Sequence, residues 1–530
     1  MIECARHSPV DLCGDRGGPS VDDGVGLAQR IFLKKEFDPM QSTPLTRPPF
    51  VAGSVPEYRT PELLINGRWR SGRGALRIAV CNPATEEPLG DFSSASTEDL
   101  AEALAASELG FAAWRQRPAR ERAEILERGV ARMLERLETI AIWLTLEQGK
   151  TLAESRQEVQ VAAEMIKWYA EESRRVYGRL ASSRLVGATM EVRKYPVGPV
   201  LALSPWNYPV ILTARKIGGA LAAGCSVIVK AAEETPAAVA AMVDGLQAEL
   251  PPGVLQLVYG NPVEISETLI ASPVIRKVSF TGSVGVGRTL ARQCAEGFKR
   301  TTMELGGHAP VIVWADADLD RFVPMLVGHK FRNAGQACLA PTRFLVHKSI
   351  EREFCDRFVT EAQALKLGNG MNPAVQMGPM VNARRKAAMA PLVADALAHG
   401  AEMACGGAMG GLGHFHAPTV LRNVPPTARI MSEEPFGPLA PITGFNTLEE
   451  ALTIANHNPY GLAAYLFTDS RRIANVVTEQ LEVGAIAINN VMVSTPEAPF
   501  GGLKDSGIGS ESGMEGMASF LETRTVHAAH

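Results

Sequence analysis

The stretch from Val200 to Lys230 reads VLALSPWNYPVILTARKIGGALAAGCSVIVK. The short apolar runs 200–203 and 227–229 each precede a helix-like segment, and the runs 255–258 and 278–280 do the same. Short β runs that alternate with helices are typical of a parallel sheet covered by helices on both faces. The sequence therefore predicts an α/β fold.

This pattern returns at the apolar runs 310–314 and 344–347. We therefore expect a second α/β unit, with the pair Gly306-Gly307 as a hinge between the two. The pattern before residue 200 is different, because a short strand and turn at 63–69 precede helical periodicity. The predicted helices cover 97–115, with Ser96 and Asp99 as a capping pair, then 119–148 and 152–175.

Composition and charge exclude several classes of partner. The chain has 530 residues, of which 46% are hydrophobic and 21% charged, as is usual for a globular protein with a large core. A formal net charge of −4 supplies no positive field for nucleic acid or an acidic membrane. The longest uncharged stretch, 197–214, contains three prolines, which argues against a membrane-spanning helix.

Cysteine usage and the N-terminus give two further expectations. Eight scattered cysteines without CxxC pairs indicate free thiols in a reducing compartment, so we expect a cytoplasmic protein without a metal site. Residues 1–60 lack a secretory apolar core and are expected to form a mobile extension.

Polar or glycine-rich turns follow three of the predicted strands: 204–209, 230–233 and 281–287. Ligands bind at the carboxyl ends of strands in such sheets. Lys230 and Glu233 have the groups to bind ribose hydroxyls, and a carboxylate there would repel a 2′-phosphate, which favours NAD over NADP. The glycines at 282–287 would let a pyrophosphate approach a helix N-terminus, although they do not form the GxGxxG pattern.

Two reactive side chains lie in small turns further along the chain. Cys338 ends the segment FRNAGQAC (331–338), and Glu304 begins ELGG (304–307). A thiol in such a turn is a candidate nucleophile and the carboxylate a candidate base, which together suggest catalysis through a thioester. Taken singly, either residue is more typical of a structural role.

Several motifs in order resemble those of the aldehyde dehydrogenase superfamily, from about Leu63 to Val526. They are PWNYP (205–209), Lys230 with Glu233, FTGS (280–283), ELGG (304–307), GQAC (335–338), EEPFGP (433–438) and PFGGLK (499–504). The resemblance implies a Rossmann-like cofactor domain (61–183 and 199–305), a catalytic α/β domain (306–508) and an oligomerisation arm (184–198 and 509–530). It also implies a homodimer or homotetramer.

The same resemblance implies roles for individual residues. Cys338 would attack the aldehyde to give a thiohemiacetal, Asn207 would hold the oxyanion, and Glu304 would activate the water that hydrolyses the thioester. The expected cofactor is NAD, with NADP less favoured. The residues expected to bind it are Ser204, Trp206, Lys230, Glu233, Gly282, Ser283, Gly287, Leu305, Glu434 and Phe436.

The substrate is expected to be a small aldehyde with a carboxylate. Arg215 lies eight positions after Asn207 on the same predicted helix, and Arg332 lies six before Cys338. Arginine binds carboxylates bidentately. Arginines at both positions, with Ser494 assisting, resemble NAD-dependent succinate-semialdehyde dehydrogenases, which implies oxidation of succinic semialdehyde to succinate.

Three alternatives remain. The substrate could be another semialdehyde (glutaric or 2-oxoglutaric) or an amino- or hydroxy-aldehyde. Acyl transfer to coenzyme A is a second alternative, against which the presence of Glu304 argues. A catalytically silent protein on the same fold is the third, and intact Cys338, Glu304 and Asn207 argue against it.

Overall fold

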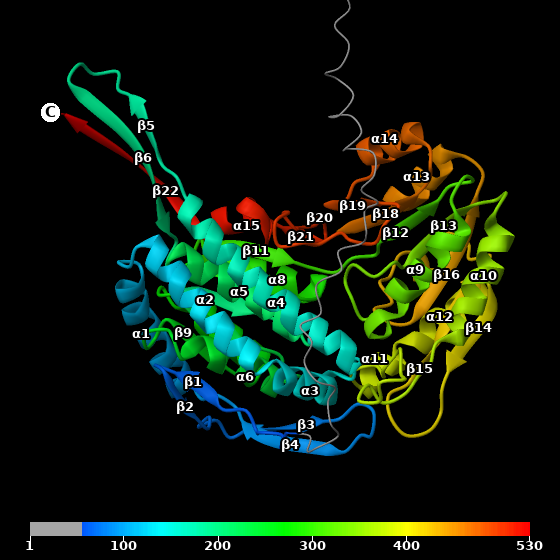
Figure 1. The fold of residues 1–530 in the computed structure, drawn as a ribbon, viewed down its shortest axis with the longest axis horizontal. Coiled ribbons are helices and arrows are strands. Elements are labelled where there is room, and N and C mark those ends of the chain that lie inside the picture. The colour runs from blue at the N-terminus through cyan, green and yellow to red at the C-terminus, as the bar shows by residue number, and fades with distance from the viewer. Residues whose placement is uncertain (1–55, 530) are drawn as a thin grey trace, which may run out of the picture. The chain divides into compact units, whose positions relative to one another are not determined.

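A computed structural model describes residues 56–529, and Figure 1 shows their arrangement. Residues 1–55 of the predicted N-terminal extension lie outside the described residues, and residues 56–60 belong to no helix or strand. Within the described part of the chain, no helix has both the length and the apolar character needed to cross a membrane.

The first sheet has the strand order β2-β1-β9-β8-β7-β10-β11-β21. Its five strands from β9 to β11 are parallel, as predicted, and β1, β2 and β21 pair antiparallel at the edges. The bounds are β1 (Leu63–Ile65), β2 (Arg68–Arg70), β7 (Val200–Leu203), β8 (Val227–Lys230), β9 (Leu255–Val258), β10 (Lys277–Thr281), β11 (Arg300–Glu304) and β21 (Gly507–Ile508).

Local sequence explains how strands and helices alternate here. Every residue of β7, β8, β9 and β10 is buried, as expected for strands covered on both faces. The helices α5, α6 and α7 each begin with a proline, whose missing N–H costs nothing in a first turn. α5 ends at Gly224, where φ is +98° and glycine is favoured.

Two groups of helices pack with this sheet. The helices α2 to α6 contact one another, and within this group α5 contacts β7 and β8 while α6 contacts β9. The helices α1, α7 and α8 form a second group, in which α1 contacts β9 and α8 contacts β10 and β11. The bounds are α1 (Thr97–Trp114), α2 (Ala119–Glu135), α3 (Leu137–Gln148), α4 (Leu152–Glu172), α5 (Pro209–Ala223), α6 (Pro236–Gln247), α7 (Pro262–Ala271) and α8 (Val284–Glu296).

The predicted capping box of Ser96 and Asp99 is confirmed at the start of α1. The single helix expected over 119–148 is wrong in one respect, because α2 and α3 are separate. At Arg136 the backbone has φ −103° and ψ 12°, outside the helical region. Both helices bury apolar residues, so periodicity alone did not reveal the break.

The second sheet has the order β14-β15-β16-β13-β12-β18-β19, and all pairs are parallel except β14 with β15. This confirms a second α/β unit. The bounds are β12 (Pro310–Val313), β13 (Arg343–His347), β14 (Glu402–Ala408), β15 (His416–Arg422), β16 (Leu439–Phe445), β18 (Ala463–Phe467) and β19 (Ala485–Ile488). Its helices are α9 (Leu319–Phe331), α10 (Glu351–Ala364), α11 (Ala383–Ala387), α12 (Met389–Ala398), α13 (Leu448–Asn456) and α14 (Arg471–Gln480).

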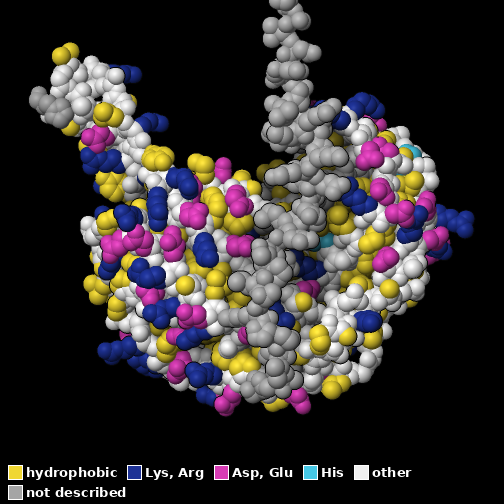
Figure 2. Space-filling view, in the orientation of Figure 1, with side chains coloured by type: hydrophobic (Ala, Val, Ile, Leu, Met, Phe, Trp, Pro, Cys, Tyr) yellow, Lys and Arg dark blue, Asp and Glu magenta, His cyan; other side chains and the backbone are white. Residues whose placement is uncertain are grey.

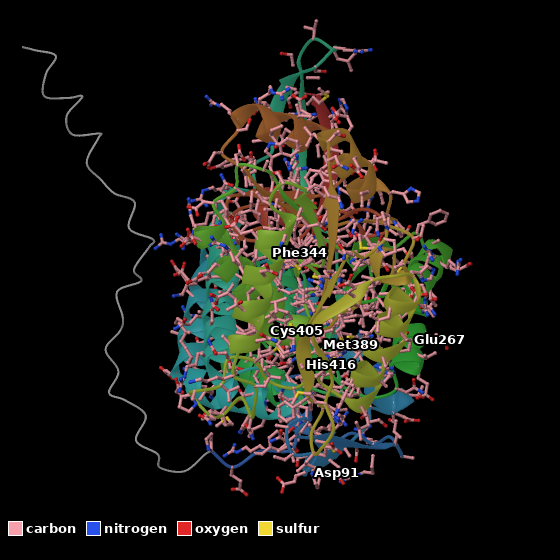
Figure 3. All side chains as sticks on the ribbon, turned by 90° about the vertical axis from the view of Figure 1, so that its right-hand side faces the viewer. Asp91, Glu267, Phe344, Met389, Cys405 and His416 are labelled. Carbon is pink, nitrogen blue, oxygen red and sulfur yellow. The ribbon has the colours of Figure 1, made fainter. Side chains whose placement is uncertain are left out.

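Each large sheet has its own hydrophobic core. The first core draws on residues 63–305 together with Met517 and Phe520, and the second draws on residues 309–487. Figure 3 views the second unit from its outer side and labels Phe344 and Met389, which belong to the second core. The chain passes from one core to the other through the loop after β11, which contains Gly306 and Gly307.

A three-stranded sheet projects beside the first unit, where β22 pairs with β6 and β6 with β5 (Figure 1). Figure 2 shows hydrophobic side chains on this projection, where Leu180, Leu185 and Val186 are exposed. The bounds are β5 (Arg179–Ser182), β6 (Ala188–Pro196) and β22 (Leu521–Ala529); the remaining elements are β3 (Arg77–Cys81), β4 (Pro88–Ser93), β17 (Tyr460–Gly461), β20 (Leu503–Lys504) and α15 (Gly513–Ala518). The predicted domain boundaries remain predictions.

Candidate active site

Four neighbouring parallel strands, β8, β7, β10 and β11, end at one edge of the first sheet. The chain first adds β8 and β9 on one side of β7 and then adds β10 and β11 on the other, so the strand order reverses at β7 and β10. A reversal of this kind creates a crevice at the carboxyl ends of the strands, where ligands bind. The polar turns singled out in the sequence all follow these strands.

Cys338 follows a turn with an unusual backbone. Just beyond α9, the φ angles of Asn333, Ala334 and Gly335 are +51°, +53° and +71°. For Ala334 this left-handed conformation costs roughly 1–2 kcal/mol. Gly335 is required for space as well, because a Cβ there would collide with the carbonyl oxygen of Gly437. A strained turn of this kind persists only where surrounding contacts hold it.

The Asn207 side chain reaches this turn from the segment before α5. Its Nδ2 donates to the carbonyl oxygen of Gln336 at 3.1 Å, two residues before Cys338, and the side chain is buried. The amide has two N–H groups. One therefore binds the turn, which leaves the second N–H of the amide to donate elsewhere.

The Cys338 thiol is half-buried. Burial raises its pKa to about 12, and the carboxyls of Glu434 and Glu304 add to the rise while Arg215 opposes it. At pH 7 such a thiol is ionised in about one molecule in 10⁵. The resting thiol is therefore protonated, and the site has to favour the thiolate at the moment of attack.

Glu304 is the last residue of β11 and is 2% exposed. Neither of its carboxyl oxygens has a hydrogen-bond partner within residues 56–529. Burial raises the pKa of Glu304 well above its usual range, Glu511 adds to the rise, and Lys216 and Arg215 oppose it. A carboxyl with a raised pKa and no fixed partner is suited to exchange a proton with water near Cys338.

Lys216 and Glu511, beside Glu304, were not singled out from the sequence. Lys216 Nζ contacts Glu511 Oε1 at 2.5 Å and Thr281 Oγ1 at 2.7 Å. Burial opposes ionisation of Glu511, yet Lys216 and Arg215 lower its pKa. The charge on Glu511 thus disfavours a second charge on Glu304. A signal was present in the sequence, because Arg215 and Lys216 are the only charges between residues 197 and 229.

The cofactor side of the crevice has an ion pair and an open helix end. Lys230 Nζ and Glu233 Oε2 are 2.7 Å apart, and Glu233 Oε1 accepts from Gly260 N at 3.3 Å. Ser283 precedes α8 without a side-chain cap, and a Cβ at Gly285 would meet nothing within 4 Å. The first turn of α8 can therefore be approached by an anion. A carboxylate for ribose hydroxyls beside an open helix N-terminus fits a nicotinamide dinucleotide.

Residues from the second unit close this crevice. Gly307 N donates to Glu434 Oε1 at 3.3 Å, and a Cβ at Gly306 would lie 2.5 Å from Glu434 Oε2. The rings of Trp206 and Phe436 meet edge to face, with centroids 5.6 Å apart. Gly307 and Glu434, 127 positions apart in the sequence, thus come together, as do Trp206 and Phe436.

The other predicted cofactor residues make mostly packing contacts. A Cβ at Gly287 would collide with Leu305, and one at Gly282 would collide with the ring of Phe280. Gly287 therefore allows α8 to approach Leu305 closely, and Gly282 leaves room for the Phe280 ring. The hydroxyl of Ser204 lies 2.6 Å from that of Thr213 and is engaged with α5.

The substrate side contains the two predicted arginines in different settings. Arg215 is 3% exposed, its Nη2 donates to Ser494 Oγ at 3.0 Å, and its guanidinium lies 4.9 Å from the Phe500 ring centre. Its Nε and Nη1 have no hydrogen-bond partner within the described residues. Arg332 is half-buried, 5.6 Å from the ring centre of Tyr208, and its Nε is unpartnered within the same residues.

Comparisons with known proteins agree with this geometry. The profile of the aldehyde dehydrogenase family matches residues 69–526. The 4-(hydroxymethyl)benzenesulfonate dehydrogenase of Comamonas testosteroni is 60% identical over 470 residues, which are 89% of this chain and 98% of that protein. The mitochondrial succinate-semialdehyde dehydrogenase of Arabidopsis thaliana is 42% identical over 465 residues, 87% of this chain and 88% of that protein.

A solved structure supports the same relationship. The succinate-semialdehyde dehydrogenase of Burkholderia pseudomallei superposes with a TM-score of 0.88 at 39% identity, covering 91% of this chain and 100% of that one. The fold and the resemblance expected from the sequence are thereby confirmed. The chain belongs to the aldehyde dehydrogenase family, whose members are NAD(P)-dependent oxidoreductases that act on aldehydes.

Proposed function

We propose that this enzyme oxidises an aldehyde that carries an anionic group at its far end. The observation that carries the proposal is Arg215, whose buried Nε and Nη1 have no hydrogen-bond partner among residues 56–529 while Ser494 holds Nη2. Leaving buried charged donors unpaired costs free energy that a bound anion would recover. The alternative substrate, an amino- or hydroxy-aldehyde, carries no anionic group and leaves these donors without a function.

Two anions fit this proposal. Succinic semialdehyde, with succinate as product, remains our candidate, and the identity with the Arabidopsis enzyme supports it. A benzenesulfonate aldehyde is the second, because the Comamonas relative at 60% identity is named for a benzenesulfonate. Arg215 beside Phe500 would suit either group, since guanidinium binds carboxylate and sulfonate alike and an aromatic ring can pack on Phe500. Glutaric and 2-oxoglutaric semialdehydes belong to the same class.

We assign the reaction steps to three residues. Cys338 Sγ gives up its proton to solvent and bonds to the aldehyde carbon, the carbonyl oxygen becomes an oxyanion, and the Asn207 amide with the backbone N–H of Cys338 stabilises it. The chemistry that a bound nicotinamide supplies is acceptance of a hydride. The acyl group left on Cys338 is a thioester, which water attacks while Glu304 takes the proton. The carboxylic acid is then released and the thiol restored.

The cofactor proposal is NAD rather than NADP. Glu233 is held by Lys230 and Gly260 N, so its carboxylate has little freedom to withdraw from a 2′-phosphate. Ser283 and the first turn of α8 would bind the pyrophosphate, and Glu434 with Phe436 and Trp206 would hold the nicotinamide ribose. We also propose a homodimer or homotetramer, which the exposed apolar residues of the β5-β6-β22 projection support.

One panel of assays tests these proposals. Wild-type kcat/KM is measured for succinic, glutaric and 2-oxoglutaric semialdehydes, 4-formylbenzenesulfonate, benzaldehyde and butanal, each with NAD and with NADP. We expect kcat/KM for each anionic aldehyde to exceed that for its neutral counterpart without the anionic oxygens by at least tenfold, with NAD preferred. Equal values for 4-formylbenzenesulfonate and benzaldehyde, and for succinic semialdehyde and butanal, would refute the anion proposal. Coenzyme A should not increase turnover.

A further inference from the structure

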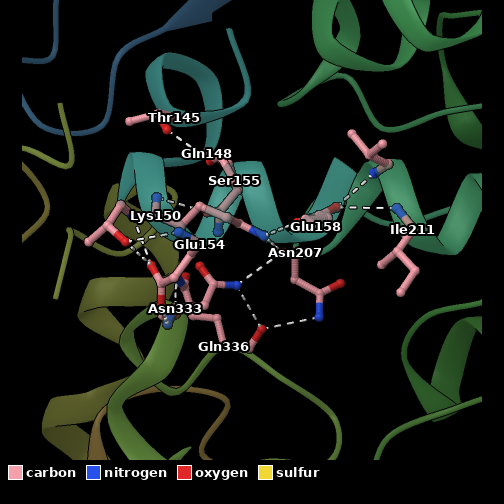
Figure 4. A network of polar contacts seen from close by, with 12 residues as sticks. Thr145, Gln148, Lys150, Glu154, Ser155, Glu158, Asn207, Ile211, Asn333 and Gln336 are labelled. Carbon is pink, nitrogen blue, oxygen red and sulfur yellow. Dashed lines mark hydrogen bonds and ion pairs between the residues drawn. The ribbon is translucent and has the colours of Figure 1, made fainter. Parts of the chain in front are cut away.

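Three charged residues around the start of α4 take no part in the steps above, yet they contact both catalytic segments. They are Lys150, Glu154 and Glu158. Glu154 and Glu158 lie four residues apart on one face of α4, and Lys150 lies just before the helix. In the sequence this pattern is typical of a solvated helix face. Figure 4 shows instead that the three side chains point toward Asn207 and Asn333.

Lys150 and Glu158 form an ion pair whose side chains have no exposed surface. Lys150 Nζ donates to Glu158 Oε2 at 2.5 Å and to the carbonyl oxygen of Asn207 at 2.7 Å. It also lies 3.9 Å from the ring centre of Tyr208. The ammonium group thus binds the backbone of the residue whose side-chain amide serves the oxyanion.

The second oxygen of Glu158 fixes the helix that follows Asn207. Glu158 Oε1 accepts from Val210 N at 2.9 Å and from Ile211 N at 3.3 Å (Figure 4). The residue before α5, Tyr208, provides no side-chain cap, so Glu158 caps this helix from α4. Lys150 and Glu158 therefore hold Asn207 through its carbonyl group and through the helix start three residues later.

Glu154 holds the turn that leads to Cys338. Its Oε2 closes a capping box with Thr151, and its Oε1 accepts from Asn333 N at 2.8 Å. Asn333 is the first of the residues with positive φ in that turn. Because the left-handed backbone at 333–335 is unfavourable by itself, a fixed acceptor for Asn333 N is one of the contacts that keep it in place.

The two segments are also joined to each other. Asn333 Nδ2 donates to Asn207 O at 3.0 Å and to Gln336 O at 3.3 Å, and the Asn207 amide donates to the same Gln336 oxygen. The carbonyl oxygen of Asn207 thus accepts from both Lys150 and Asn333. A displacement of either segment changes the distance between the Asn207 amide and Cys338.

We propose that Lys150, Glu154 and Glu158 are positioning residues that set the Asn207 amide against Cys338 and thereby the rate of attack on the aldehyde. None of them is placed to touch the reacting atoms. The inference rests on the proposed roles of Asn207 and Cys338 but not on the anionic end of the substrate. A misplacement of about 1 Å between reacting groups reduces a rate by as much as about 10²-fold, so small shifts here are measurable.

The first test is the double variant Lys150→Met/Glu158→Gln, which removes both charges and leaves no buried charge unpaired. We expect kcat to fall about 10- to 100-fold while KM for NAD changes less than about twofold, since the cofactor residues lie elsewhere. The same pair of changes is then made in an Asn207→Ala background. If Lys150 and Glu158 act through the Asn207 amide, the two changes should lower kcat less than about threefold in the Asn207→Ala background.

An equal loss of kcat in both backgrounds would overturn the proposal, because the ion pair would then act independently of Asn207. Unchanged kcat in the double variant would overturn it as well. All rates use the aldehyde that the wild type oxidises fastest, whether anionic or neutral. If the preferred substrate is not anionic, the wild-type panel will show this. The comparison of the kcat losses in the two backgrounds can still be interpreted.

Glu154 provides a second test that does not depend on folding of the double variant, because its side chain is only half-buried. Glu154→Ala should reduce kcat about tenfold, and Glu154→Gln, which keeps an acceptor for Asn333 N, should stay within about threefold of wild type. Arg156→Ala is the matched control on α4, since Arg156 pairs with Glu138 and should leave kcat unchanged. Equal losses in Glu154→Ala and Glu154→Gln would contradict the positioning role of Glu154.

Discussion

Replacing Arg215 by methionine should remove the preference for anionic aldehydes while leaving a working enzyme. Methionine keeps an unbranched apolar side chain beside Phe500 but lacks the guanidinium that holds Ser494. The variant therefore deletes a charge from the far end of the substrate site with little change in volume. The quantity to compare is the ratio of kcat/KM for an anionic aldehyde to kcat/KM for the neutral aldehyde with the same carbon skeleton.

The magnitude follows from Nε and Nη1 of Arg215, the two donors that have no partner in the described part of the chain. A hydrogen bond to a charged group contributes about 1.5–3 kcal/mol, so two give about 3–6 kcal/mol before the anion is stripped of water. Because that desolvation consumes part of the gain, we expect about 3–4 kcal/mol, or a loss of about 10²- to 10³-fold in kcat/KM for the anion.

The neutral aldehyde corrects for an indirect effect. Arg215 opposes the rise in the pKa of Cys338, so its removal should slow every substrate to some extent. Dividing kcat/KM for the anionic aldehyde by kcat/KM for the neutral aldehyde cancels this contribution. The assay is initial-rate formation of reduced cofactor, with 4-formylbenzenesulfonate against benzaldehyde and succinic semialdehyde against butanal.

Two further variants complete the series. Ser494→Ala leaves Arg215 in place and should lower the ratio only about fivefold, since one neutral partner is lost. Arg332→Met removes the other arginine, which is half-buried and whose Nε has no partner within residues 56–529, and should lower the ratio about tenfold. If Arg215→Met leaves the ratio at its wild-type value for both pairs of aldehydes, Arg215 is structural and our reasoning about its free donors is wrong.

Three other outcomes are expected. Glu304→Gln should produce one rapid burst of reduced cofactor and then turn over at least about 10²-fold more slowly, because the thioester persists without a base; a wild-type steady-state rate would contradict this. Glu434→Gln should lower the pKa of the Cys338 thiol by removing a nearby negative charge. Burial raises the pKa of Glu434 itself to about 8, so this carboxyl carries its charge mainly above pH 8. Iodoacetamide should therefore inactivate the variant faster than wild type above pH 8 and at a similar rate at pH 7. Glu233→Ala should reduce the preference for NAD over NADP at least about tenfold in kcat/KM, whereas unchanged preference would exclude Glu233 as the discriminating residue.

The repetition of apolar runs and helix starts was sufficient to predict both parallel sheets. Runs such as β8 are buried on both faces, and a continuous apolar run is the local consequence of that burial. The helical periodicity predicted to stop at residue 148 does stop there, at Gly149, whose left-handed backbone favours glycine. The break at Arg136 escaped prediction because both helices around it keep an apolar face.

For the candidate site, short motifs singled out Cys338 and Glu304 as candidates through the chemistry of their functional groups, the resemblance to aldehyde dehydrogenases added Asn207, and the roles of all three stay predictions. Their electrostatic state was decided only by the tertiary structure. Burial and the carboxyls of Glu434 and Glu304 raise the pKa of Cys338, and Glu511 reaches Glu304 from more than 200 residues away in sequence. Such charges interact through space, over distances that no local pattern encodes.

The contacts of the charged residues around α4 were likewise decided only by the tertiary structure. From the sequence, Glu154 and Glu158 are two ordinary acidic residues of an amphipathic helix, and only the fold turns them toward Asn333 and Val210. The sequence by itself thus determined which reactive groups this protein has and the α/β fold that carries them. The tertiary structure decided which charges are buried together and which free donors of Arg215 remain, because hydrogen bonding and desolvation depend on neighbours brought from distant segments.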